Sequence, residues 1–185
     1  MLRAIANRLL ARRRSSRKLP SAMKDIRVVH IGGYWRGPND VVRQMMLGLR
    51  QTGAEVLEVC TDDHPDMLDT EGRPYDRGTY GPVWIRPQYL SQLIGSFSPH
   101  VVVCNAGGLG FRTEDAEQIR QRSYIVGIAL SDPDVFLPAT SKVSRTSDLF
   151  FTNAAACIPQ YESLGVRAKL LHFATYEGFY RPVPQ

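Results

Sequence analysis

The end of the chain, from Asp148 onward, constrains the fold more than any other part of the sequence. An apolar segment at 148–153 is followed by a stretch that stops at Gly165, by a second apolar segment at 168–174, and by a proline-bearing exit at 179–182. Short apolar runs separated by a glycine-terminated stretch are typical of a strand, a helix and a strand. Strands joined by a helix lie parallel in one sheet, so this segment predicts a parallel α/β architecture.

The rest of the chain repeats this alternation. Apolar, β-branched segments predict four earlier strands, at 26–31, 54–60, 100–104 and 123–130. Helical spacing and capping signals predict helices between 39 and 53, at 88–95, at 113–122 with Thr113 as its cap, and at 139–145, whereas the Asp-, Pro- and Gly-rich run 61–87 is expected to be a long loop. About six strands separated by helices predict a Rossmann-like, doubly wound parallel sheet.

Positive charge is concentrated at the start of the chain. Residues 1–24 hold eight of the 23 basic residues and no acid, so the remaining 161 residues hold 15 basic and 18 acidic residues, a net charge of −3. We therefore separate a basic leader, 1–24, from a folded body. The body is of ordinary single-domain size, and its charge shows no bias toward nucleic acid.

The leader has an amphipathic pattern, because Leu2, Ile5, Leu9 and Leu10 share one side of a helical projection and arginines surround them. Such a segment is compatible with contact between residues 1–18 and an anionic membrane surface or an acidic partner; a solvated leader and an organellar presequence are the alternatives. No apolar run is long enough for a signal peptide or a membrane span. We expect a soluble, cytoplasmic protein whose stability is nearly unchanged by deletion of the leader.

The cysteines and the histidine-containing loop do not predict a metal or disulfide site. Cys60, Cys104 and Cys157 are odd in number and widely spaced, so we expect buried, small hydrophobic side chains in a reducing cytoplasm. His64 lies among carboxylates, but adjacent residues rarely converge on one ion, so no metal is expected there. Asp62 is a weak candidate for a ribose contact, because the Gly-x-Gly-x-x-Gly fingerprint is missing.

The first candidate binding loop follows the first predicted strand. In an open parallel sheet, ligands bind beyond the carboxyl ends of the strands. Gly32 and Gly33 allow a ligand to approach the backbone, Trp35 offers a stacking surface, and Arg36 offers a bidentate donor. The alternative interpretation is a tight turn that requires glycine.

Polar or glycine residues also follow three other predicted strands: Asn105 with Gly107 and Gly108, Asp132 with Asp134, and Asn153. Asp132 is the candidate general base, because a carboxylate at a strand end can accept a proton from a substrate hydroxyl. Asp-Pro is also a common turn former, and Asp134 and Asn153 are equally compatible with capping roles. We expect all these residues to surround one cleft.

Several motifs carry a family resemblance. They are Gly-Gly at 32–33, Asn-Ala-Gly-Gly at 105–108, Leu-Ser-Asp-Pro-Asp at 130–134, Asp-Leu-Phe-Phe-Thr-Asn at 148–153, the Tyr-x-x-Leu-Gly helix at 161–165 and the Phe-Tyr-x-Pro exit at 179–182. From Asp25 to Pro184 the sequence resembles the N-terminal half of GT-B glycosyltransferases, in particular the bacterial CgeB-like (spore-maturation) glycosyltransferase-like proteins.

The resemblance implies that residues 25–178 form an acceptor-side domain and that residues 179–185 lead toward a C-terminal domain that binds the nucleotide-sugar donor. It implies transfer of a sugar to an acceptor, with Asp132 as the base and with no metal or cofactor other than the donor co-substrate. The expected partner is that second domain, or a separate chain that supplies it. A non-catalytic Rossmann-like module that binds a ligand or partner is the alternative, and the missing fingerprint disfavours an NAD-type oxidoreductase.

Overall fold

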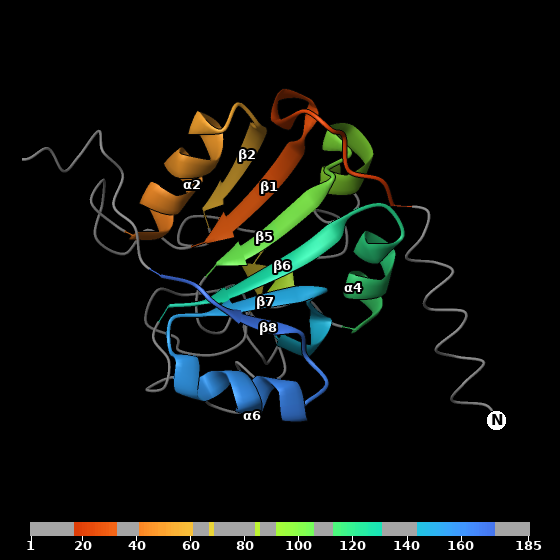
Figure 1. Cartoon of the computed structure of the whole chain (residues 1–185). Coiled ribbons are helices and arrows are strands. Elements are labelled where there is room, and N and C mark those ends of the chain that lie inside the picture. Colours follow the sequence, from red (N-terminus) through yellow and green to blue (C-terminus); the bar gives the residue numbers. More distant parts are fainter. Residues whose placement is uncertain are drawn as a thin grey trace, which may run out of the picture.

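The computed structural model describes residues 17–32, 41–60, 67–68, 84–85, 92–105, 113–130 and 144–172. Its centre is a six-stranded parallel sheet in the order β2-β1-β5-β6-β7-β8 (Figure 1). The strands are β1 (Arg27–Gly32), β2 (Glu55–Cys60), β5 (Val101–Asn105), β6 (Tyr124–Ala129), β7 (Leu149–Thr152) and β8 (Ala168–Leu170). All six predicted strands are present, and the prediction of a Rossmann-like α/β fold is confirmed.

The helices lie on both faces of this sheet. Helix α2 (Val41–Gln51) packs on one face, which we call the α2 face, where Met45 and Leu49 contact the cluster around Val28 and Val103. The opposite face, the α4 face, carries the π-helical turn η3 (Leu93–Phe97), α4 (Thr113–Arg120), the turn η4 (Ala155–Cys157) and α6 (Ile158–Ser163). Strand residues therefore alternate between two apolar layers, as a sheet buried on both faces requires.

Two apolar clusters fill the α4 face. The first joins β1, β2, β5 and β6 to η3 and α4, with Ile31, Ile119 and Ile125 fully buried. The second joins β7 and β8 to α6, where the rings of Phe150 and Tyr161 lie 4.6 Å apart. Burial of these large side chains is the main source of stability in a domain of this size.

Gly127 of β6 shows how closely this second cluster is packed. A Cβ atom on Gly127 would lie 2.6 Å from Cδ2 of Phe150 and 2.5 Å from Oγ of Ser147. Glycine in a strand interior normally marks a close approach by another group. Here the ring of Phe150 takes the space that a side chain on β6 would need.

Some sequence-based predictions of local structure were wrong. The run 61–87 contains a short antiparallel pair, β3 (Met67–Leu68) with β4 (Trp84–Ile85), whose strands are too short to show an alternating pattern. Of the helix predicted at 88–95, residues 92–95 are helical and continue in η3 to Phe97, whereas residues 88–91 lie outside the described residues. Helix α4 already includes Thr113, so this residue belongs to the first turn and does not precede it. The closing strand ends at Leu170, whereas the prediction extended it to 174.

The chain enters the fold through Arg17, which is 8% exposed. Its Nη1 donates to the Ser123 carbonyl and to Oδ2 of Asp148, both at 2.9 Å, and its Nη2 donates to Oδ1 of Asp148 at 3.3 Å. The guanidinium lies 4.2 Å from the ring centroid of Tyr124, whose hydroxyl donates back to the Arg17 carbonyl at 2.9 Å. The expectation that the whole leader is dispensable for stability stays a prediction, and these contacts make Arg17 the residue of the leader from which we expect a loss of stability.

Asp148 connects this contact to the sheet. Its carboxylate accepts a hydrogen bond from the Ile125 amide at 2.9 Å, while its own amide donates to the Ile125 carbonyl at 2.8 Å. Nε of Arg120 approaches the same carboxylate at 3.5 Å. The aspartate at the head of the Asp-Leu-Phe-Phe motif thus fixes the starts of β6 and β7, and Arg17 neutralises its charge.

Candidate functional site

The strands end together at one edge of the sheet, which we call the carboxyl edge. Gly32, the last residue of β1, lies opposite Asn105, the last residue of β5. Asn105 lies opposite Ile128 of β6, and Ala129 of β6 lies opposite Thr152 of β7. The four segments that follow these strands therefore start side by side, as the sequence predicted from the parallel topology.

The strand order gives one position on this edge a special geometry. From β1 the chain moves outward through α2 to β2, and it then returns past β1 to β5. Helix α2 accordingly covers one face, whereas η3 and α4 cover the other. Sheets with this strand order bind ligands in the crevice between the two strands at which the connections diverge, here β1 and β5. Gly32 and Asn105 stand directly on either side of that point.

Most of the predicted site residues fall outside the described residues: Gly33, Trp35, Arg36, Gly107, Gly108, Asp132 and Asp134. Their assignment stays a prediction. What the structure adds is the common origin of the segments that carry them, since residues 33, 106 and 131 each come within two residues of a strand end at the carboxyl edge.

Asn153 is the remaining predicted residue, and it lies directly after β7 with its side chain half-buried. Ala154, the next residue, occupies the N-cap position of η4 without a side-chain cap, and the Ala154 amide donates to Oγ1 of Thr152 at 3.1 Å. Whether Asn153 binds a ligand or supports the start of η4 stays a prediction.

His30 is a buried polar residue that the sequence analysis treated only as part of a strand. It lies on β1 two residues before Gly32, so both share the α2 face. His30 is 0% exposed, and neither Nδ1 nor Nε2 has a hydrogen-bond partner. Burial, with a smaller contribution from the charge of Arg50, lowers the pKa of His30 to about 4. The imidazole is therefore neutral at physiological pH.

The surroundings of His30 explain why it stays neutral. Glu58 of β2 lies opposite His30 in the register and on the same face, but its carboxylate is directed to Nη2 of Arg50, at 3.5 Å. In the sequence, His30 was visible as a polar residue in the first strand, separated from Arg27 by two valines. Nothing in the pattern predicted that its nitrogens would lack partners.

The other titratable groups of the sheet have structural roles. Nδ1 of His100 accepts a hydrogen bond from the Arg27 amide at 2.9 Å, and the pKa of His100 is lowered by desolvation and by the Arg27 charge. Cys104 and Cys157 are buried, as predicted, and neither forms a disulfide; burial raises the pKa of the Cys104 thiol. Among the described residues, no cluster of His, Cys, Asp and Glu is arranged to hold a metal ion.

Comparisons with known proteins add no family. No protein-family model matches the chain, and no curated protein matches it. The resemblance to GT-B glycosyltransferases therefore rests on the motifs themselves and on their positions at the ends of β1, β5, β6 and β7.

Proposed function

We propose that this chain is the acceptor-side half of a GT-B-type glycosyltransferase, similar to the CgeB-like proteins, and that it transfers a sugar from a nucleotide-sugar donor to an acceptor hydroxyl. One observation supports this most: the two glycine-bearing motifs of the resemblance, at 32–33 and 105–108, begin at the strands that flank the divergence point of the sheet. That is the position where doubly wound sheets bind ligands.

In the proposed reaction, the segments after β1 and β5 hold the acceptor. Asp132 comes three residues after the end of β6 at Ala129 and takes the proton of the acceptor hydroxyl. The acceptor oxygen forms a bond to the anomeric carbon of the donor, and the bond from that carbon to the nucleoside diphosphate breaks. A second domain binds the donor, and helix N-termini and basic side chains offset the charge of the leaving diphosphate without a metal.

This proposal makes the isolated chain inactive but able to bind acceptor-like sugars. The full chain is incubated with UDP-glucose, UDP-N-acetylglucosamine or GDP-mannose, and release of nucleoside diphosphate is measured. We expect no transfer and no donor hydrolysis. Robust turnover by this chain alone would contradict the two-domain proposal.

Binding is tested separately with a panel of methyl glycosides of common hexoses and N-acetylhexosamines, titrated by calorimetry. Gly33→Val places a β-branched side chain in the predicted binding loop and should abolish binding, and Trp35→Ala should weaken it with little loss of stability. Gly48→Ala is the matched control, because a Cβ on Gly48 meets nothing within 4 Å.

The outcomes separate the two candidate functions. If Trp35→Ala lowers the stability of the domain strongly but leaves glycoside binding by the folded protein unchanged, the loop is a packing element and the site assignment fails. If the chain binds a folded partner protein at this edge but none of the glycosides, the non-catalytic binding module replaces the glycosyltransferase.

A further inference from the structure

The strands begin at the edge opposite the carboxyl edge, and this amino edge carries most of the exposed positive charge. Seven Lys and Arg are exposed among the described residues with described side chains, and six of them lie at the strand starts or in the segments that lead into them. These six are Lys18, Lys24, Arg50, Arg122, Arg145 and Arg167. Three exposed carboxylates, Asp25, Glu55 and Glu162, lie in the same segments, so the exposed charge of this edge is 6 − 3 = +3.

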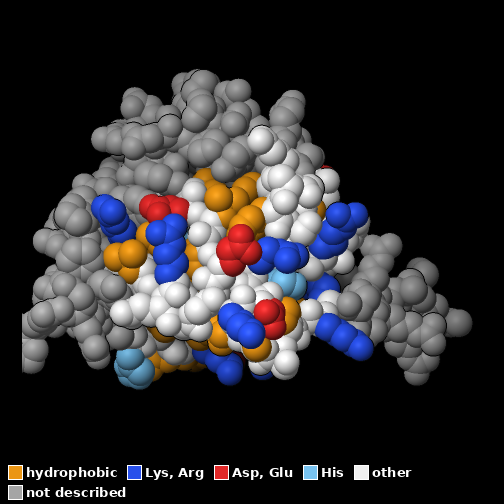
Figure 2. Space-filling view, turned by 90° about the horizontal axis from the view of Figure 1, so that it is seen from above, with side chains coloured by type: hydrophobic (Ala, Val, Ile, Leu, Met, Phe, Trp, Pro, Cys, Tyr) orange, Lys and Arg blue, Asp and Glu red, His pale blue; other side chains and the backbone are white. Residues whose placement is uncertain are grey.

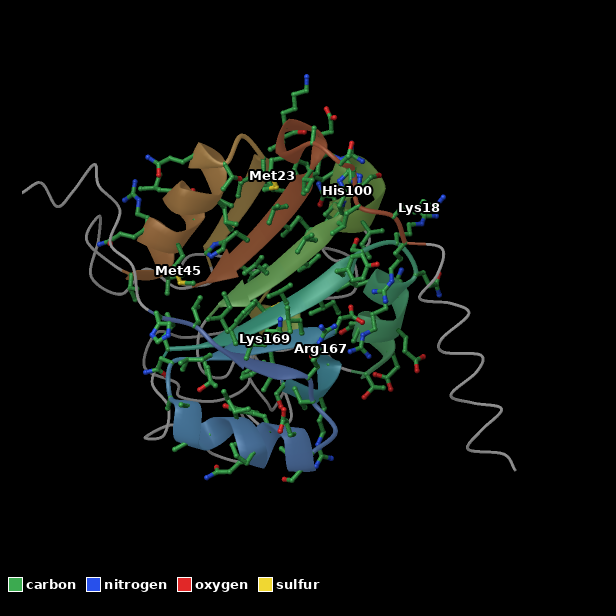
Figure 3. All side chains as sticks on the ribbon, in the orientation of Figure 1. Lys18, Met23, Met45, His100, Arg167 and Lys169 are labelled. Atoms are coloured by element: carbon green, nitrogen blue, oxygen red, sulfur yellow. The ribbon has the colours of Figure 1, made fainter. Side chains whose placement is uncertain are left out.

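Exposed apolar side chains occur at the same edge. Within the described part of the chain, the large hydrophobic residues that stay exposed are Leu19 and Met23, at 49% and 43%. Both belong to the segment that follows Arg17, and Lys18 and Lys24 lie beside them in the sequence. Figure 3 shows Lys18, Met23 and His100 in the upper half of the molecule, with Lys18 at its right side. In Figure 2, which looks down from above, Lys and Arg side chains lie beside apolar ones, with Asp and Glu side chains among them.

Part of this charge has a local explanation. Arg50 and Arg122 lie at or just beyond the carboxyl ends of α2 and α4, where cations complement the helix dipole. Lys18 and Lys24 have no such role, since no α-helix ends at either residue. Helix stability therefore does not explain why these two lysines lie in the same segment as exposed Leu19 and Met23.

The contacts of Arg17 hold the start of the described chain at the amino edge. Its guanidinium is held by Ser123, Asp148 and Tyr124, all at the starts of β6 and β7. Lys18 and Leu19, which follow Arg17 directly in the sequence, are therefore anchored at that edge.

We propose that the amino edge, through Lys18, Leu19, Met23 and Lys24, docks on an anionic membrane surface. Anionic lipid headgroups attract clustered Lys and Arg, and apolar side chains among them enter the headgroup region. The phosphates of a nucleic acid would contact the cations, but they would not bury the exposed apolar side chains of Leu19 and Met23. Docking in this orientation turns the carboxyl edge away from the membrane, and it does not depend on the proposed function.

The test is flotation of the full chain with vesicles of phosphatidylcholine alone or mixed with phosphatidylglycerol. Binding is expected only to the mixed vesicles and should fall with added salt. Lys18→Ala with Lys24→Ala should weaken partitioning by about fivefold for each cation removed. Leu19→Ser with Met23→Ser should weaken it further at unchanged charge.

Lys169→Ala is the matched control, because Lys169 is an exposed cation on β8, which lies four strands across the sheet from β1, the strand that Lys18 and Lys24 precede. It should bind vesicles like the unmodified chain, and circular dichroism should show that every variant is folded. The proposal is overturned if the chain does not bind the mixed vesicles, or if Lys169→Ala weakens binding as much as the amino-edge variants do. It is also overturned if the chain binds duplex DNA more tightly than vesicles and the changes at Leu19 and Met23 have no effect on vesicle binding.

Discussion

The two edges of the sheet are built in opposite ways. At the amino edge, residues that are far apart in the chain are joined by side-chain hydrogen bonds: Arg17 reaches Ser123 and Asp148, 106 and 131 residues away. At the carboxyl edge, the strands end at Gly32, Asn105, Ala129 and Thr152, and glycine- and aspartate-containing segments begin. The difference indicates that side-chain contacts at the amino edge stabilise the fold, whereas the carboxyl edge is where the chain leaves the sheet for the segments that carry the predicted site residues.

Arg17→Ala is the change expected to have the largest effect on stability. The side chains of Arg17 and Asp148 are only 4% and 10% exposed, and loss of the arginine leaves a buried carboxylate without its closest cation. Removing one partner of such a pair lowers the free energy of unfolding by about 3 kcal/mol or more. We expect the lower end of that range, because Arg120 also approaches Asp148 and offsets part of its charge. Thermal unfolding should show a fall in Tm of about 6–12 °C.

Two controls determine whether the amino edge is responsible. Lys18→Ala removes the neighbouring, exposed cation and should change Tm very little. Deletion of residues 1–16 should also have little effect, whereas deletion of residues 1–17 should reproduce Arg17→Ala. Equal stability of the two truncations would mean that Arg17 contributes nothing and that the edges do not differ in this way.

The second prediction concerns His30, which lies between the two edges. Its pKa of about 4 in the fold is below the 6.5 expected in the unfolded chain, so the unfolded state binds a proton first as the pH falls. The stabilising contribution of neutral His30 is fully present above pH 6.5 and is lost as the pH falls toward 4. The free energy of unfolding falls by up to about 3 kcal/mol over this range.

Urea unfolding between pH 7 and 4 measures this effect. His30→Leu removes the titration and should flatten the loss of stability, while the charged pair of Glu58 and Arg50 on the same face is retained. His100→Gln is the matched control, because His100 has a hydrogen-bond partner and lies partly exposed at the start of β5. An identical pH dependence for His30→Leu and the unmodified chain would show that His30 does not stay neutral in the fold.

Gly127→Ala should lower the free energy of unfolding by about 1–3 kcal/mol, because the new Cβ would lie 2.6 Å from the Phe150 ring. The matched change Gly48→Ala, in α2 and with nothing within 4 Å, should be neutral or stabilising by up to about 1 kcal/mol. Chemical unfolding of the two variants compares them directly. If both variants are equally stable, the packing of β6 against β7 is looser than the structure indicates.

The sequence was sufficient for the sheet but not for the contacts across it. Strands such as 100–104 could be predicted because each is a short β-branched run, and parallel order then follows from the intervening helices. The pairing of Arg17 with Asp148 could not be predicted, because no local pattern relates residues 131 positions apart. For the same reason the isolated imidazole of His30 looked like an ordinary strand residue.

The candidate site was predictable only in its position. Parallel topology alone places Gly32, Asn105 and Asn153 on one edge, and the register confirms this for Gly32 and Asn105. The divergence of the chain between β1 and β5 required the strand order, which periodicity does not reveal. The roles of Trp35, Arg36 and Asp132 depend on side-chain positions in the segments beyond the described strand ends.

The most direct test of the difference between the edges is a map of ligand-induced chemical-shift changes. The ¹⁵N-labelled chain is titrated with the methyl glycosides of hexoses and N-acetylhexosamines, and the backbone amides are followed. We predict that the amides of Gly32, Asn105 and Asn153 shift, whereas those of Lys24 and Arg122 at the amino edge do not. Shifts confined to the amino edge, or no shift at any residue of the carboxyl edge, would contradict the assignment of ligand binding to the ends of β1 and β5.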